Sequence, residues 1–222
     1  MITSYTRIAG QSLDRLAALS DGIFAVVMTL LVLDLRVPVM DGHEHGEHPL
    51  WHAGMWSSER EVWHALMEVG PHVLPYAISF MTLGIFWIAQ QTQFNHFART
   101  DRNLTWIHLV FLAVVSLMPF STGLLSEYVT YRIPFVLYWL NLLFLGLMML
   151  VSLRYARRAG LLKAEATDEV LVAQRRRVYF YQVCYAAAVA LCVVNTYVSM
   201  VALILLQLAS ALAPPIPPFN RY

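Results

Sequence analysis

The chain has 222 residues, of which 59% are hydrophobic and only 13% are charged, and its mean hydropathy is +0.57. A water-soluble domain of this length needs more polar surface to cover its core, so the composition indicates an integral membrane protein. The formal net charge of +1 gives no indication of a nucleic-acid partner.

The first apolar segment, residues 16–37, contains an uninterrupted apolar run of only 12 residues that begins at Gly22. A run of this length also fits the core of a signal peptide, with Arg7 and Arg15 as its basic flank. The following residues, 34–38, contain no small-x-small cleavage site. We therefore interpret the segment as the first membrane helix.

Five further apolar segments follow in the chain, at residues 69–92, 104–127, 134–156, 178–195 and 197–213. Four of the six segments are long enough to cross a hydrocarbon core, which takes ~20 helical residues. No Gly or Pro separates the last two, and one continuous helix would overshoot the bilayer, so we expect a tight turn near Asn195-Thr196. The sequence predicts an all-α polytopic protein with six transmembrane helices in one transmembrane domain, residues 1–222.

The basic residues are distributed unevenly between the two sides of such a protein. With six spans both termini share one side, and twelve of the fifteen Lys and Arg residues fall there. They are Arg7, Arg15, Arg99, Arg102, Arg154, Arg157, Arg158, Lys163, Arg175, Arg176, Arg177 and Arg221. Only Arg36, Arg60 and Arg132 fall on the other side. Basic loops remain in the cytoplasm, so we expect both termini to be cytoplasmic.

The segment between the first two helices, residues 39–68, then forms an extracytoplasmic loop. It is rich in histidine and carboxylate residues: His43, His45, His48, His52, His64, Asp41, Glu44, Glu47, Glu59 and Glu61. Such clusters can bind divalent metal, but the H-x-H-x-x-H spacing is loose and no regular secondary structure is expected to position the ligands. A solvated, mildly pH-sensitive loop is the simpler interpretation, and we predict no metal site and no cofactor. The basic run at residues 175–177 is likewise interpreted as a cytoplasmic helix start near anionic lipid, not as a ligand site.

Polar side chains inside a bilayer are costly and therefore informative. The first segment holds Ser20, Asp21 and Thr29, with Arg15 just before it. Arg15 and Asp21 are six residues apart and point to different sides of a helix, so each is expected to bond to a neighbouring helix rather than to the other. The alternative is that Arg15 extends to the lipid headgroups as an interfacial anchor.

Helical spacing places Gly22, Val26, Thr29 and Leu33 on one stripe, with Leu30 beside it. Such a stripe can face lipid, another helix or a pore axis, and spacing alone favours ordinary helix packing. The sequence has no Thr-Val-Gly-Tyr-Gly loop of the kind that forms a carbonyl selectivity filter. It also lacks the paired Gly/Pro-broken segments of many transporters.

The run Arg15-Leu-Ala-Ala-Leu19-Ser20-Asp21 resembles the Arg-x-x-x-Phe-Ser-Asp signature of the bacterial relatives of the lysosomal potassium channel, transmembrane protein 175. The resemblance continues to about residue 158 through motifs in the second, third and fourth helices. These are Tyr76-Ala-Ile-Ser79-Phe80, Gly84-Ile-Phe86-Trp87, Leu117-Met-Pro119-Phe120-Ser121 and Tyr138-Trp-Leu-Asn141-Leu.

The resemblance implies a homotetramer in the bacterial plasma membrane, with the first helix of each subunit lining a central pore. Such a channel passes potassium in preference to sodium without a carbonyl filter. Aliphatic side chains form its narrowest rings, and these map onto Val26, Leu30 and Leu33; a hydroxyl that faces the ion maps onto Thr29, and Gly22 allows close approach or bending. The polar network that holds the helix maps onto Arg15, Ser20 and Asp21.

The chain departs from the family pattern at three places. Leu19 replaces the signature Phe and is expected to pack as an apolar residue. Val26 is smaller than the usual Ile or Leu, so the constriction is expected to be less tight. Gln90-Gln91 stands where relatives often have His-His, so a titratable partner for the first helix is missing.

Two other classes of protein remain as alternatives. A proton-coupled secondary transporter would use Asp21 with His96 or His108, but His96 is expected in a cytoplasmic loop and His108 near a helix start. A membrane metalloenzyme or haem protein would need histidines at ligand spacing within the membrane, and most of the eight histidines lie in the loop of residues 39–68. We therefore predict a channel and not an enzyme.

Overall fold

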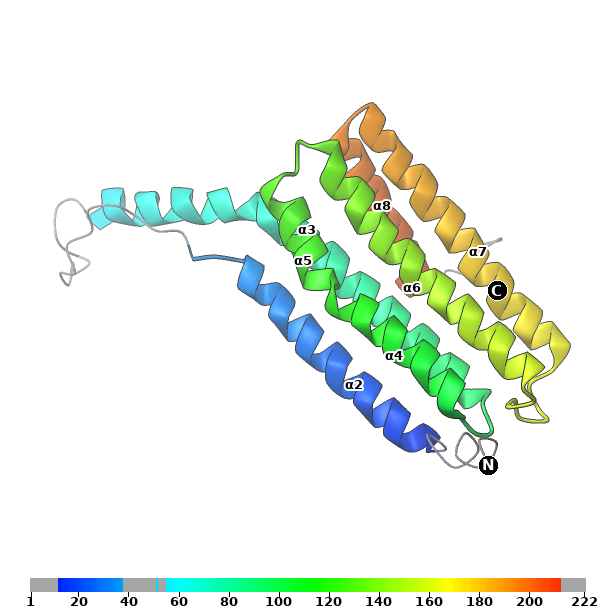
Figure 1. Ribbon diagram of the computed structural model, residues 1–222. Coiled ribbons are helices and arrows are strands. Elements are labelled where there is room, and N and C mark those ends of the chain that lie inside the picture. Colours follow the sequence, from blue (N-terminus) through cyan, green and yellow to red (C-terminus); the bar gives the residue numbers. More distant parts are fainter. Residues whose placement is uncertain (1–11, 38–50, 52–54, 213–222) are drawn as a thin grey trace.

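The computed structural model describes residues 12–37, 51 and 55–212, and Figure 1 shows these as a bundle of long helices. The helices are α2 (Leu13–Leu30), α3 (Met55–Asn95), α4 (Arg102–Ser116), α5 (Met118–Glu127), α6 (Arg132–Arg158), α7 (Asp168–Ala190) and α8 (Thr196–Leu212). Short 3-10 helices follow α2 and α7: η1 (Leu31–Asp34) and η2 (Leu191–Val193). No β-strand forms in these residues, so the prediction of an all-α fold is confirmed.

Four stretches of the described residues are long and apolar enough to cross a membrane: Leu13–Asp34, Glu59–Asn95, Arg102–Glu127 and Arg132–Arg158. They correspond to the first four predicted segments. The last apolar helix, α8, is shorter, with 17 residues. It follows α7 through a turn at the expected place, because the Asn195 side-chain oxygen accepts bonds from the backbone N–H groups of Tyr197 (2.8 Å) and Val198 (3.3 Å) and so caps α8.

Prolines account for two differences between the expected and observed helix bounds. The first helix ends at Asp34 rather than Val37, because Pro38 has no N–H to donate to the Asp34 carbonyl. The expected continuous helix over residues 104–127 is divided at Leu117 into α4 and α5, since Pro119 lies in the first turn of α5 and cannot continue the bonding of α4.

The second helix is much longer than expected. It begins at Met55 rather than at residue 69, so the later part of the predicted loop is helical and the expectation of a loop there was wrong. Residues 59–68 are mostly good helix formers, but their charges lower the hydropathy on which the segment was recognised. His64 lies in this helix, whereas His43, His45, His48 and His52 lie outside the described residues.

Two prolines, Pro71 and Pro75, lie inside α3. A proline removes a backbone hydrogen bond and bends a helix. Figure 1 shows the first part of α3 projecting sideways from the bundle and the rest running along it.

The bundle has a defined order of packing. α2 contacts α3, α4 and α5, whereas α7 contacts α6 and α8, and α8 returns to α3. In Figure 1, α2 and α7 lie on opposite sides of the bundle. Phe24 of α2 is 2% exposed, and its ring centroid lies 6.1 Å from that of Phe111 in α4. This aromatic contact packs the first helix against α4.

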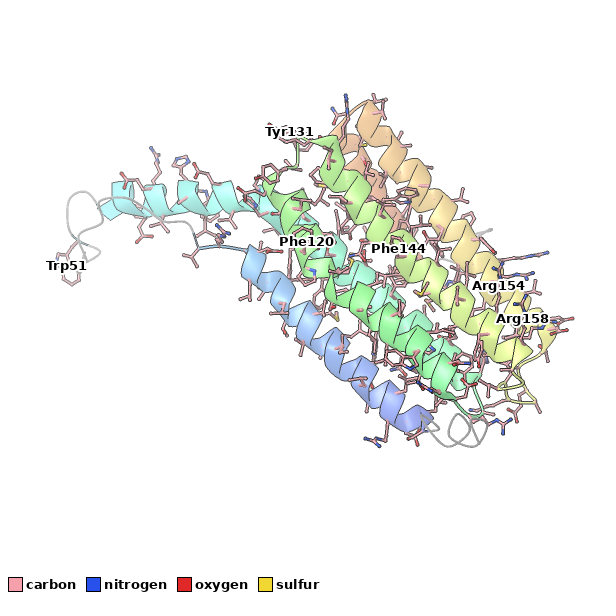
Figure 2. The ribbon with its side chains drawn as sticks, viewed as in Figure 1. Trp51, Phe120, Tyr131, Phe144, Arg154 and Arg158 are labelled. Carbon is pink, nitrogen blue, oxygen red and sulfur yellow. The ribbon has the colours of Figure 1, made fainter. Side chains whose placement is uncertain are left out.

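One end of the bundle collects the basic residues. There the α3–α4 and α6–α7 connections pair, with backbone bonds from Ala98 N to Leu161 O (2.9 Å) and from Lys163 N to His96 O (2.9 Å). Figure 2 shows Arg154 and Arg158 towards this end and Tyr131 at the opposite end.

Candidate pore-lining helix

The first helix, α2, has one face that packs against its own subunit. Leu16, Ser20, Phe24 and Val27 are buried, and Leu31 in η1 continues the same face. They recur every three or four residues, which is the spacing of one side of an α-helix.

The predicted stripe lies on the other face. Val26 is 56% exposed, Leu30 42% and Leu33 69%, and Gly22 and Thr29 are also exposed. The structure thus brings all five predicted pore residues onto one exposed side of α2 and η1. No residue of this stripe is buried within the subunit, and Leu30 is its most covered aliphatic side chain. That the stripe lines a pore stays a prediction.

The Thr29 hydroxyl is held by its own helix. Its Oγ1 donates a hydrogen bond to the Val26 carbonyl oxygen at 2.7 Å. Since the proton points into the helix backbone, the lone pairs of the hydroxyl oxygen remain available outside it. The group can therefore act as an acceptor, which is the property a cation requires.

Asp21 anchors α2 to α3. Its Oδ1 accepts hydrogen bonds from Trp87 Nε1 (2.8 Å) and from Gln91 Nε2 (2.7 Å), which lie one turn apart on α3. Gln91, where the resemblance led us to expect His, thus supplies a donor to Asp21. The missing titratable group does not leave the carboxylate without a partner.

The other two members of the predicted polar network do not join Asp21 within the described subunit. Arg15 is exposed in the first turn of α2, where its backbone N–H donates to the capping Ser12 Oγ at 3.3 Å. The Ser20 hydroxyl is buried and has no hydrogen-bond partner among the described residues. A network that contains all three residues stays a prediction.

Leu19 is a candidate that sequence reasoning missed. It was expected to pack in place of Phe, yet it is 45% exposed in the subunit. Leu19, Gly22 and Val26 follow the spacing i, i+3 and i+7, which continues the stripe towards the start of α2. This spacing was present in the sequence and could have identified the residue.

A cavity of about 910 Å³ lies beside the far end of the stripe. Leu30 and Leu33 contribute to its wall together with ionisable residues that sequence reasoning did not single out. These are Asp34, Arg36, Glu68, His72 and Glu127. No group of three or more His, Cys, Asp or Glu in the described chain is arranged to hold a metal ion.

His108 lies near the start of α4, as expected, and its side chain is buried inside the bundle. It is 2% exposed, its Nε2 lies 2.9 Å from Ser152 Oγ, and its Nδ1 lies 3.4 Å from Gln90 Nε2. The ring of Phe94 packs on it with centroids 4.8 Å apart. Partners from α3 and α6 allow this polar ring to be buried inside the bundle. His96 lies in the α3–α4 connection, as expected.

The sequence has clear relatives. A family model described as endosomal/lysosomal potassium channel TMEM175 matches residues 15–119. A protein of Chamaesiphon minutus named as a potassium channel is 30% identical over 165 residues, which cover 72% of this chain and 70% of the relative. This chain belongs to the TMEM175 family. Four stretches of its described residues are long and apolar enough to cross a membrane, and with this family membership it is a multi-pass membrane protein.

Other members of the TMEM175 family match over shorter stretches. A Streptomyces collinus protein named as a potassium channel is 38% identical over 114 residues, or 51% of this chain and 48% of the relative. A chicken protein named as an endosomal/lysosomal proton channel TMEM175 is 33% identical over 118 residues, or 53% of this chain and 22% of the relative. The chain thus spans about half the length of the first relative and less of the second.

The fold agrees with this membership. The crystal structure of a lysosomal potassium-selective channel TMEM175 homolog from Chamaesiphon minutus superposes with a TM-score of 0.70 at 24% identity. The superposition covers 90% of this chain and 96% of the homolog.

Proposed function

We propose that the protein is a potassium-selective cation channel in which α2 of each of four subunits lines a central pore. The observation that carries the proposal is the two-faced surface of α2: one side packs into the subunit, and the apolar side with Thr29 stays uncovered along its length. Family membership supports the same activity, since relatives of this chain bear the name potassium channel. The channel moves ions down their gradient, and we expect no enzymatic activity.

Four copies of the stripe create rings of aliphatic side chains around the axis. Val26, Leu30 and Leu33 form the constriction, which excludes water when it is narrow and so leaves an ion without ligands. Thr29 adds four hydroxyl oxygens next to this constriction, and Gly22 allows close approach at its other end. Potassium is favoured over sodium because it loses its hydration shell at lower cost, so a weak polar ring is sufficient for modest discrimination.

The charge distribution supports an orientation with both termini in the cytoplasm. The end of the bundle at which α6 ends and α7 begins carries Arg154, Arg157 and Arg158, whereas Arg36 and Arg132 lie towards the other end. Basic residues are retained on the cytoplasmic side. By analogy with its bacterial relatives, the protein functions in the plasma membrane.

A flux measurement on purified protein in liposomes tests the proposal. We expect Val26→Asn to hydrate the constriction and raise the basal potassium flux several-fold. Val32→Asn is the matched control, because Val32 is exposed to a similar degree (47% against 56%) but lies off the stripe. Equal flux in wild type and Val26→Asn, with both proteins folded and tetrameric, would refute the assignment of the constriction.

The same liposomes separate a channel from a proton-coupled transporter, which family membership does not favour. In a channel, the reversal potential follows the potassium gradient and is unaffected by an imposed pH gradient. A reversal potential that shifts in fixed ratio with the pH gradient would instead indicate obligatory coupling.

A further inference from the structure

A groove of about 500 Å³ lies between α3, α7 and α8, away from the predicted pore helix. Much of its wall is apolar, with Phe80, Ile85 and Ile88 from α3 and Val178 from α7. Gly84 also lines it, and a Cβ atom added there would meet nothing within 4 Å, so α3 leaves open space at this point. The shape and lining suit a hydrocarbon chain.

The groove also has a polar, cationic part. Arg177 lines it and is exposed, with its guanidinium carbon 5.8 Å from the centroid of the Tyr181 ring. Three further polar residues contribute to the wall, and each has a buried oxygen without a hydrogen-bond partner in the described part of the chain: Gln174 Oε1, Gln182 Oε1 and Ser210 Oγ. Buried polar atoms are normally paired, so this concentration of unpaired ones points to a polar group that occupies the groove.

The location of the groove suits a lipid. It includes Gln174 and Arg177 from the first half of α7, near the basic end of the bundle that we assign to the cytoplasm. α7 lies on the opposite side of the bundle from α2 (Figure 1), so in the proposed tetramer the groove faces the bilayer rather than the pore axis. This last step rests on the proposed function; the groove and its lining do not.

We propose that this groove binds an anionic phospholipid of the cytoplasmic leaflet. An acyl chain lies along Phe80, Ile85 and Ile88, and the phosphate pairs with Arg177. The Ser210 hydroxyl and the carboxamide of Gln174 provide hydrogen-bonding groups for the glycerol esters. The role of residues 175–177 is therefore more specific than general attraction to a charged surface, because one of the three arginines lines an apolar groove and the others do not.

Lipid binding to the intact oligomer tests the proposal without any flux measurement. Native mass spectrometry of the detergent-solubilised protein, titrated with phosphatidylglycerol or with phosphatidylcholine of the same acyl chains, gives the affinity for each lipid. We expect tighter binding of phosphatidylglycerol and about a fivefold loss of its affinity in Arg177→Gln, as one arginine contributes ~1 kcal/mol near an anionic headgroup. Arg176→Gln is the matched control: it removes the same charge from a neighbouring exposed residue that does not line the groove.

A second variant tests the apolar part. Gly84→Leu places a side chain in the open space of the groove while Arg177 remains, and we expect it to abolish tight binding of phosphatidylglycerol. Equal affinity for the two lipids, or equal losses in Arg177→Gln and Arg176→Gln, would overturn the proposal. A third outcome would also overturn it: Gly84→Leu dissociates the oligomer, and added phosphatidylglycerol does not bind to the wild-type protein. That result would mean that a neighbouring subunit, and not a lipid, occupies the groove. The outcome of the Val26→Asn flux experiment does not depend on any of these results, so the two proposals can fail separately.

Discussion

The bond between Asp21 and α3 gives a prediction whose size follows from the structure. Asp21→Ala removes two hydrogen bonds to one carboxylate oxygen, from Trp87 at 2.8 Å and Gln91 at 2.7 Å. Hydrogen bonds to charged groups each contribute about 1.5–3 kcal/mol to the free energy of unfolding when they are shielded from solvent. Asp21 is exposed in the subunit, so solvent screening lowers each contribution below this range to about 1 kcal/mol, and we expect a loss of about 2 kcal/mol for the pair. For a chain of this length that lowers the Tm by about 4–8 °C.

Thermal unfolding in detergent measures this effect, and size-exclusion chromatography reports the yield of assembled protein, which we expect to fall. A double-mutant cycle of Asp21→Ala with Gln91→Ala isolates the direct bond, for which we expect a coupling energy of about 1 kcal/mol. Asp14→Ala is the control, because Asp14 is an exposed acidic residue in the first turn of the same helix. Additive losses in the cycle, or an equal loss in Asp14→Ala, would refute the anchoring role.

Three further substitutions test the site and the packing. Thr29→Val keeps the shape of the side chain but removes the hydroxyl oxygen. We expect conduction to persist while the potassium-to-sodium permeability ratio, measured from bi-ionic reversal potentials, falls about fivefold, or ~1 kcal/mol. An unchanged ratio would contradict the role of Thr29. In Gly146→Ala the added Cβ would overlap Gln182, which must move and lose its 2.9 Å bond to the Leu142 carbonyl, so we expect about 1–3 kcal/mol of destabilisation in thermal unfolding. Gly84→Ala, in open space, should be neutral or stabilising by about 1 kcal/mol, and equal effects of the two would contradict the packing argument.

Much of α2 could be predicted from the sequence because its pattern is local. The 3.6-residue period of a helix separates Phe24 and Val27 from Val26 and Thr29 without knowledge of any neighbour. The period does not say which face is covered. In this subunit the covered face is the one that holds Ser20 and Phe24, and the positions of α3, α4 and α5 decide that.

Features that depend on distant residues could not be predicted. The partners of Asp21 lie 66 and 70 residues away along the chain, and those of His108 come from α3 and α6. Helical spacing within one segment gives no register between segments, so the burial of His108 was not visible in its own helix. The early start of α3 escaped detection for another reason: hydropathy detects helices inside a membrane, and residues 55–68 are too polar to be recognised by it.

The anchor on α3 has a consequence for conduction. Asp21 lies between the buried face and the exposed stripe of α2, so its bonds to Trp87 and Gln91 oppose rotation of the helix about its own axis. Packing of Phe24 on Phe111 adds an apolar contact to α4 but no directional hydrogen bond. The direction in which Val26 points is therefore decided by side chains that do not line the proposed pore. For this reason Gln91→Ala is expected to change the basal potassium flux although Gln91 lies on α3, whereas an unchanged flux would show that packing alone fixes the orientation of α2.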